Sequence, residues 1–236
     1  MGKVGSTAVH AALDAAGIPT VTVHSLRRES LIPLARDFLE RGEFPPRHVS
    51  LSMVHRERFV AHTEGGSIAF LSGVRDPLER TLSAFFQTLH QRRDGLTHDS
   101  DPDLLWQTYL TETDQFYGIE HWFGQEFGEQ LGLDVYSVPF DRDRRIGPLP
   151  GGRGLIFRND CAHGIKEAEI GALFGRTLDI GQSNVGARKS YASAYAAVRA
   201  RARFPVDLVE RVYASRFVRQ FWTETEAGHL ARQWRG

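Results

Sequence analysis

The chain has 236 residues, of which 41% are hydrophobic and 25% charged, a balance typical of a globular domain that excludes a disordered chain. Its 29 basic and 29 acidic residues cancel, so no overall field attracts nucleic acid or an anionic membrane, and anion recognition must be local. No apolar run approaches the ~20 residues that cross a bilayer, and the N-terminus does not resemble a signal peptide. We therefore expect a soluble, cytoplasmic, single-domain protein over residues 1–236 that binds no nucleic acid and has no membrane span.

Two residue counts narrow the chemistry further. Cys161 is the only cysteine, which excludes an internal disulfide and a cysteine-cluster metal site, and we expect it to be an inert small side chain. Only three of the 29 basic residues are lysines, namely Lys3, Lys166 and Lys189. Arginine is therefore the default cation of this chain, and the three lysines are candidates for a specific role.

The first part of the chain is expected to alternate helices and strands. Ser6 or Thr7 is a suitable N-cap for a helix that runs to about Ala16, because Gly17 and Pro19 then stop it. The elements predicted next are a strand (20–26), a helix that includes Pro33 (29–42), a helix (50–62), a buried strand (67–74) and a long helix (76–93).

Helices dominate the rest of the sequence. The elements predicted there are helices near 102–112 and 117–131, a strand (133–140), an arginine- and glycine-rich turn region (142–154), a strand (154–158) and an almost wholly helical end from about 187. Alternating strands and helices favour a parallel sheet with crossover helices. We therefore predict an α/β fold with a short, mainly parallel sheet and a helical subregion at 187–236.

The opening stretch "GKVGST" (residues 2–7) has the composition of a phosphate-binding loop. Glycines allow backbone amides to approach an anion, the following helix directs its positive end there, and Lys3 adds a mobile charge. The loop is not a Walker A motif, which has four residues between its glycines and a lysine directly after the second glycine. A tight N-terminal turn without a ligand is the alternative interpretation.

A second motif, "VRDPLERTLSAFF" (residues 74–86), carries a strand directly into a helix. Asp76, Pro77 and Glu79 fit the N-cap, N1 and N3 positions of a capping box. A core-facing stripe is predicted at Leu78, Leu82, Phe85, Phe86 and Leu89. Arg75 lies at the strand end and Ser83 lies off the stripe; alternatively, Arg75 is a surface ion-pair partner and Ser83 a solvated side chain.

Together the two motifs resemble the nucleotide-binding motifs of sulfotransferases that use 3′-phosphoadenosine 5′-phosphosulfate (PAPS). The segment "VRDPLER" is similar to the carbohydrate sulfotransferases. A wider resemblance to the bacterial capsular polysaccharide synthesis family is carried by "KVGST", "VHSL", "GVRDPLERTLSAFFQ", "DVYSVPFD", "SNVGARKSY" and "VYASRFVRQFW". This resemblance implies a P-loop-like, three-layer α/β/α fold.

The resemblance also implies roles for particular residues. The 5′-phosphosulfate would be held by the first loop, through Gly2, Lys3, Val4, Gly5, Ser6 and Thr7. The 3′-phosphate would be held by Arg75 and Ser83, with Arg188 and Lys189 of "GARKS" (186–190) as the basic loop that closes over it. In the family pattern a central strand precedes the phosphate loop, so we expect the sheet to lack this first strand.

Sulfuryl transfer to a hydroxyl requires positioning, charge neutralisation and a general base. Lys3 would neutralise the leaving phosphate. His24 is the favoured base because it lies at the predicted carboxyl end of a strand, where open α/β sheets bind ligands, and because related enzymes place a histidine there. His55, His48 and Glu29 are the other candidates. We expect that no metal is required, since no His/Asp/Glu set has convincing ligand spacing.

The predicted function is therefore transfer of a sulfuryl group from PAPS to a glycan hydroxyl, in capsular or surface polysaccharide synthesis. Two other functions are kept open. One is a P-loop kinase-like phosphotransferase, which would require a Walker A loop and an acidic magnesium ligand. The other is a non-catalytic relative that binds nucleotide or glycan. The sequence carries no signal of the acceptor's identity or of oligomeric state.

Overall fold

A computed structural model describes residues 6–61, 68–91, 94–111, 121–181 and 190–235. Contacts divide the chain into two compact units, each built from two separate segments. Unit 1 comprises Met1–Val74 and His121–Gly181, and unit 2 comprises Arg75–Glu120 and Gln182–Gly236. The expectation of a single domain stays a prediction.

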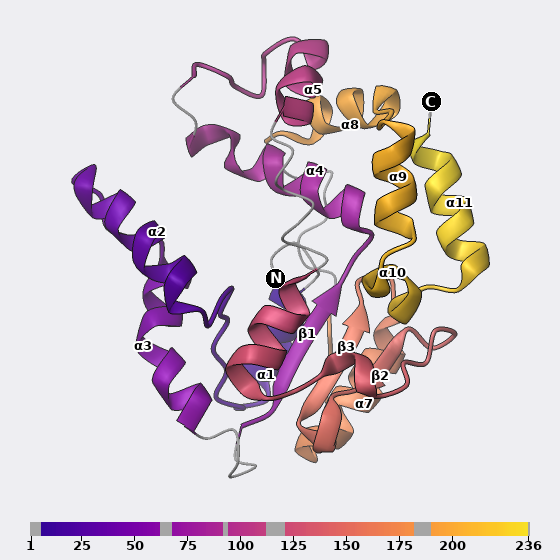
Figure 1. Cartoon of the computed structure of the whole chain (residues 1–236). Coiled ribbons are helices and arrows are strands. Elements are labelled where there is room, and N and C mark those ends of the chain that lie inside the picture. Colours follow the sequence, from indigo (N-terminus) through magenta and orange to yellow (C-terminus); the bar gives the residue numbers. More distant parts are fainter. Residues whose placement is uncertain (1–5, 62–67, 92–93, 112–120, 182–189, 236) are drawn as a thin grey trace. The chain divides into compact units, whose positions relative to one another are not determined.

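Unit 1 contains a three-stranded mixed sheet in the order β1-β3-β2 (Figure 1). Strands β1 (Phe70–Val74) and β3 (Gly154–Arg158) pair in parallel, with Phe70 opposite Gly154. Strand β2 (Ile146–Pro148) pairs with the other edge of β3 and is antiparallel. The predicted α/β class is confirmed, but the sheet is mixed rather than mainly parallel, because the expected turn region at 142–154 contributes β2.

Several α-helices in the described part of unit 1 surround or extend this sheet (Figure 1). They are α1 (Ser6–Ala15), α2 (Arg28–Glu40), α3 (Arg47–Ala61) and α7 (His163–Phe174). Helices α1 and α7 share a hydrophobic core with Leu155 and Phe157, which are alternate residues on one face of β3. Gly17 follows α1 with a φ of 71°, which explains why this helix stops where predicted.

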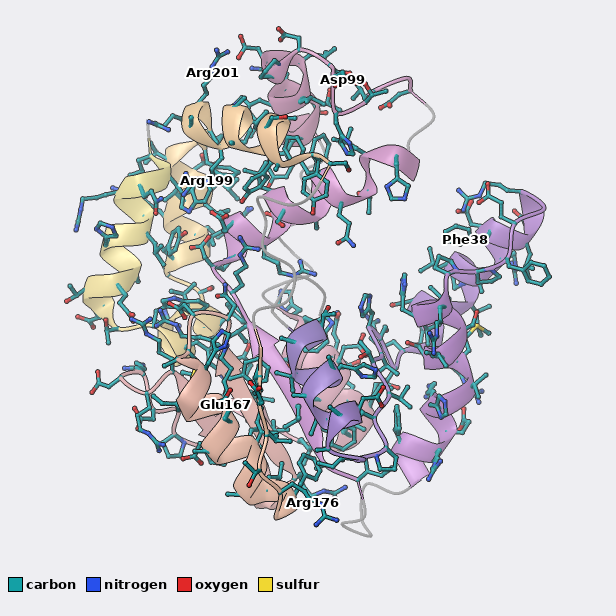
Figure 2. The ribbon with its side chains drawn as sticks, turned by 180° about the vertical axis from the view of Figure 1, so that it is seen from behind. Phe38, Asp99, Glu167, Arg176, Arg199 and Arg201 are labelled. Carbon is teal, nitrogen blue, oxygen red and sulfur yellow. The ribbon has the colours of Figure 1, made fainter. Side chains whose placement is uncertain are left out.

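Helices α2 and α3 pack against each other through a small core of their own. Leu31, Ala35 and Val49 form this core, and Pro33 is accommodated inside α2 as predicted. Figure 2 shows Phe38 among the side chains of helices α2 and α3. The Arg41 guanidinium lies over the Phe38 ring, 4.3 Å from the centre of the ring. The predicted helices at 29–42 and 50–62 are thus confirmed, the second beginning three residues earlier than expected.

Two predicted strands of unit 1 are wrong. Residues 20–26 form no strand, and residues 133–140 contain a short 3₁₀ turn (Val135–Ser137) instead. In the second case the Asp134 carboxylate accepts the Tyr136 N–H at 3.0 Å, and this local bond competes with strand pairing. The helix predicted at 117–131 is described from residue 121 onward and includes a π-helical stretch, Gly124–Glu129.

In its described residues, unit 2 consists mainly of helices joined by short turns and loops. Its helices are α4 (Pro77–Thr88), continued by a 3₁₀ turn (Leu89–Gln91), α5 (Pro102–Thr111), α8 (Ala192–Arg201), α9 (Val206–Tyr213), α10 (Arg216–Phe221) and α11 (Glu224–Trp234). The predicted α4 stripe is at most 4% exposed at each position. A helical chain end is therefore confirmed, and within the described ranges no helix is long and apolar enough to cross a membrane.

Candidate functional site

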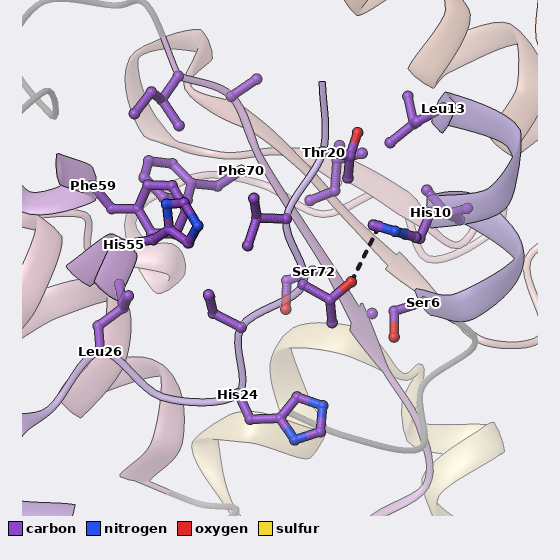
Figure 3. Close-up of a pocket in the computed structure, with 18 of the residues that line it drawn as sticks. Ser6, His10, Leu13, Thr20, His24, Leu26, His55, Phe59, Phe70 and Ser72 are labelled. Atoms are coloured by element: carbon purple, nitrogen blue, oxygen red, sulfur yellow. Dashed lines mark hydrogen bonds between the residues drawn. The ribbon is translucent and has the colours of Figure 1, made fainter. Parts of the chain in front are cut away.

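Unit 1 contains a cavity of about 770 Å³ beside β1 that is partly open to solvent (Figure 3). Its lining comes from α1, residues 18–26, α3, β1 and the helical stretch near Glu126. It therefore collects side chains from segments more than 100 residues apart in sequence. Two of the predicted site residues, Ser6 and His24, lie in this lining.

The start of α1 lies at this cavity. Ser6 is the first residue of the helix and half-buried, whereas Thr7 is exposed and does not line the cavity. The first turn of a helix carries N–H groups without intrahelical partners and a partial positive charge, which favour an anion. The other residues of the predicted phosphate loop, Gly2, Lys3, Val4 and Gly5, lie outside the described residues.

His24 is placed by side-chain anchors rather than by a neighbouring strand. Its backbone N–H donates to Ser52 Oγ at 3.3 Å. Directly after it, the Ser25 hydroxyl and the Leu26 N–H donate to the two carboxylate oxygens of Glu126 at 2.6 and 2.5 Å. These bonds satisfy the polar groups that a strand would pair, so the segment can be extended without joining the sheet.

A second imidazole, that of His48, stacks on His24 with ring centres 4.4 Å apart and an angle of 29° between the planes. Burial lowers the pKa of His48, so this ring favours its neutral form. The Ser52 hydroxyl donates to the His48 carbonyl at 2.7 Å and so links the two histidine segments. His48 therefore lies beside the favoured base as a packing partner.

Aromatic side chains form one wall of the cavity. Phe59 stacks on His55 with centres 5.7 Å apart and meets Phe70 edge to face at 6.3 Å. On the α1 side, the Thr22 hydroxyl and His10 Nδ1 are hydrogen-bonded at 3.3 Å, as the dashed line in Figure 3 marks. His55 thus lines the same cavity as His24. The remaining base candidate, Glu29, is exposed on α2 and is not part of the lining.

In unit 2 the second predicted motif forms an ion-pair network. Arg75 donates to Glu79 Oε1 at 2.8 Å, and the Tyr195 hydroxyl donates to the same oxygen. Arg199 Nε donates to the other oxygen, Oε2, at 2.9 Å. Burial opposes ionisation of Glu79, but these donors outweigh it and hold the pKa of its carboxyl below the ordinary value.

The capping box predicted for α4 is half formed. The Asp76 carboxylate accepts the Glu79 N–H at 2.7 Å, as expected of an N-cap. The Glu79 side chain binds Arg75, Tyr195 and Arg199. Ser83 lies four residues after Glu79 on α4 and is 7% exposed, so the alternative that it is solvated is wrong. Arg188 and Lys189 lie outside the described residues.

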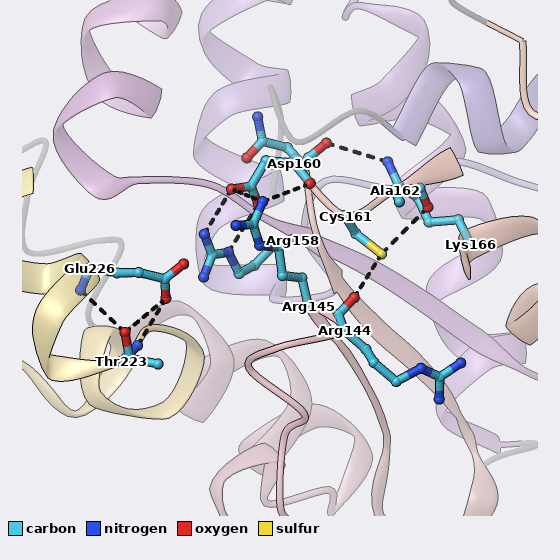
Figure 4. Close-up of polar contacts among 10 residues, drawn as sticks. Arg144, Arg145, Arg158, Asp160, Cys161, Ala162, Lys166, Thr223 and Glu226 are labelled. Carbon is cyan, nitrogen blue, oxygen red and sulfur yellow. Dashed lines mark hydrogen bonds and ion pairs between the residues drawn. The ribbon is translucent and has the colours of Figure 1, made fainter. Parts of the chain in front are cut away.

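A polar cluster at the carboxyl end of β3 is internally paired (Figure 4). Arg158 donates to both carboxylate oxygens of Asp160, at 2.9 and 2.7 Å, and Arg145 donates at 3.1 Å. Burial opposes ionisation of Asp160, but Arg158 outweighs it and lowers the pKa of the carboxyl. Cys161 is buried next to this cluster, and its thiol donates to the Arg144 carbonyl at 3.2 Å. Both features stabilise the end of β3.

Glu126 anchors the segment after His24, and His48 stacks on His24. The sequence analysis assigns Glu126 no role and names His48 only as a candidate base. Glu126 is 5% exposed and lies on the same helical face as Phe123 and Phe127. A carboxylate on an apolar stripe is a detectable signal, because such a group needs buried donors. His48 was considered only as a base, since stacking between distant segments leaves no sequence pattern.

Comparison of the chain with models of known protein families, with curated proteins and with solved structures finds no match. Within the described part of the chain, no group of three or more His, Cys, Asp or Glu side chains is arranged to hold a metal ion. The features that bear on function are therefore the cavity in unit 1, the ion-pair network in unit 2 and the motif resemblance.

Proposed function

We propose that this protein transfers a sulfuryl group from PAPS to a hydroxyl of a glycan. The observation that carries the proposal is the coexistence, in one cavity, of a helix start at Ser6 and the imidazole of His24. A helix start favours an anion, and an imidazole accepts a proton near neutral pH. Transfer of an anionic group to a hydroxyl uses both of these properties.

His24 takes the proton of the acceptor hydroxyl in this proposal. As a sulfur–oxygen bond forms to the acceptor oxygen, the bond from sulfur to the donor phosphate breaks, and the acceptor proton moves to the imidazole. The anchors at Ser52 and Glu126 support this role because they hold the His24 segment at fixed points. Burial of the stacked His48 lowers its pKa and so disfavours an opposing positive charge beside His24.

The anionic ends of the donor are assigned to the two motifs. The α1 amides and the Ser6 hydroxyl receive the 5′-phosphosulfate, and Lys3 remains the predicted partner of the leaving phosphate. Arg75 and Ser83 receive the 3′-phosphate. Arg75 suits this role because its side chain is 23% exposed and Glu79 occupies one of its five N–H donors, which leaves donors for a phosphate.

An aromatic wall supports the assignment of a sugar as acceptor. Phe59, Phe70 and Trp122 all line the cavity. Aromatic faces pack against the C–H face of a sugar ring, while hydroxyl and imidazole groups bind its hydroxyls. The Ser72 hydroxyl is one such group in the lining. The acceptor hydroxyl would then reach His24 from a surface that suits a glycan.

The test is sulfuryl transfer from radiolabelled PAPS to a panel of neutral bacterial polysaccharides. Wild-type protein is expected to label at least one acceptor, and His24→Ala is expected to lower the rate by ~10²- to 10⁴-fold, as loss of a general base does. His90→Ala is the matched control, since His90 is exposed in unit 2. Equal rates for wild type and His24→Ala between pH 6 and pH 9 would remove His24 from the mechanism.

A further inference from the structure

Arg199 shares the Glu79 carboxylate with Arg75, and neither sequence motif includes it. Its Nε donates to Glu79 Oε2 at 2.9 Å, while Arg75 donates to Oε1 at 2.8 Å. Two guanidinium groups therefore converge on one carboxylate. Since both bonded nitrogens lie within hydrogen-bond distance of the same carboxylate, they are at most about 8 Å apart. Two oxygens of a single phosphate group can span that separation.

The charges of this cluster favour a further anion. Two guanidinium groups face one carboxylate, so the cluster keeps a net charge of +1 at neutral pH, because the donors hold Glu79 ionised. The side chains of Arg75 and Arg199 are each 23% exposed, and that of Glu79 is 21% exposed. Solvent ions thus have access to a cluster whose positive charge is only half neutralised.

Both arginines are held in place before any ligand binds. The Arg199 guanidinium lies over the ring of buried Trp234, 3.8 Å from its centre, which fixes the plane of the fork. Tyr195 lies one turn before Arg199 on α8, and its hydroxyl donates to the Glu79 oxygen that Arg75 uses. Such fixed forks lose little conformational freedom when they bind a tetrahedral anion.

We propose that Arg199 and Arg75 form one two-guanidinium site for a phosphate dianion, preassembled by Glu79 and Tyr195. The identity of the ligand as the 3′-phosphate of the donor rests on the proposed function. Arg199 is then a second residue, beside Arg75, that distinguishes this donor from nucleotides without a 3′-phosphate. Glu79 acts as the shared counter-ion that keeps two like charges together and does not itself contact the ligand.

The first experiment uses inorganic phosphate as the probe and follows the arginine Nε–Hε NMR signals of the full chain. Arg75→Lys and Arg199→Lys each remove one signal and so assign it. Phosphate is expected to shift both signals with one dissociation constant, whereas sodium chloride at the same ionic strength is expected to shift neither. A phosphate shift of the Arg75 signal alone, or of neither signal, would overturn the proposal.

Variants test the contribution of Arg199 to affinity. Arg199→Gln is expected to weaken phosphate binding by about tenfold or more, the scale of one charge-assisted contact. Arg201→Gln is the matched control, because Arg201 lies on the same helix and pairs with Asp103 at the surface (Figure 2). Tyr195→Phe removes only a hydroxyl, so it tests the same site if Arg199→Gln folds poorly. It is also expected to weaken phosphate binding. Unchanged affinity in a folded Arg199→Gln or in Tyr195→Phe contradicts the proposal.

The same variants separate this inference from the proposed function. Affinities are compared for 3′-phosphoadenosine 5′-phosphate and for adenosine 5′-phosphate. If the 3′-phosphate adds nothing to nucleotide affinity while inorganic phosphate still shifts both arginine signals, the two-arginine site stands and the PAPS assignment fails. If the 3′-phosphate raises affinity equally in wild type and in Arg199→Gln, Arg199 is no ligand of that group.

Discussion

At the scale of single residues, two carboxylates hold the side chains to which the proposed function assigns a role. Glu126 holds the segment after His24, and Glu79 holds two arginines, each through several donors. A carboxylate in such a position is costly unless its donors are present, so each one specifies the position of its neighbours. In the proposed function, His24 and the two arginines are therefore positioned by carboxylates that take no part in the transfer.

The stacked histidine pair predicts a pH dependence of stability. Burial lowers the pKa of His48 from its ordinary value of 6.5, so the unfolded state binds a proton more readily than the folded state. Stability is then unaffected well above pH 6.5 and falls as the pH drops through 6.5 toward the lowered value. In urea denaturation between pH 5 and pH 8, the free energy of unfolding should fall less steeply toward acid pH for His48→Gln than for wild type. His90→Gln, at an exposed position, should leave the decline unchanged; a decline as steep in His48→Gln as in wild type would contradict this account.

Among the glycines that the structure describes, Gly154 has the least room for a side chain. Its φ is +141°, and a Cβ there would lie 1.8 Å from the carbonyl oxygen of Phe70, inside the β1–β3 pair. Gly154→Ala is expected to lower the free energy of unfolding by about 2–4 kcal/mol. Gly164→Ala, in the first turn of α7 with open space around it, is expected to be neutral or slightly stabilising. Similar urea midpoints for the two variants would refute the expected clash.

Local chemistry decides which elements form at the scale of helices and strands. Helix α4 follows its sequence signals, because Asp76 caps it, Pro77 occupies its first position and its apolar stripe is buried. Residues 20–26 have the alternation of a strand, yet their N–H groups find side-chain acceptors at Ser52 and Glu126. Helix α7 escaped prediction because its N-cap, Ala162, offers no side-chain acceptor.

The cap of α4 predicts a graded stability effect. The Asp76 carboxylate accepts the Glu79 N–H and the Tyr213 hydroxyl, and burial raises the pKa of this carboxyl. Asp76→Ala is expected to lower the free energy of unfolding by about 1–3 kcal/mol, because it removes the cap and leaves a buried hydroxyl without its acceptor. Asp76→Asn keeps an acceptor without the buried charge and is expected to cost much less. Equal losses in urea denaturation would mean that the charge, rather than the cap, stabilises α4.

At the scale of the whole molecule, the chain forms two units, and each unit joins segments that are distant in sequence. The helices other than α7, the α/β class and the core strands at 70–74 and 154–158 were predictable from periodicity and caps. The division into units was not, because it falls after Val74, inside a continuous strand-to-helix motif. Arg199 was likewise unpredictable, since its role depends on a contact with Glu79 across 120 positions.

Calorimetric titration is the most direct test of the proposal that this chain binds a donor nucleotide through the 3′-phosphate of the nucleotide. Purified protein is titrated with 3′-phosphoadenosine 5′-phosphate, with ATP and adenosine 5′-phosphate as competitors, first in a chelator and then in magnesium. Binding is expected to need no metal and to weaken at least about tenfold when the 3′-phosphate is absent or Arg75 is changed to alanine. Equal affinity for all three nucleotides, or no binding of the 3′-phosphorylated one, would contradict it.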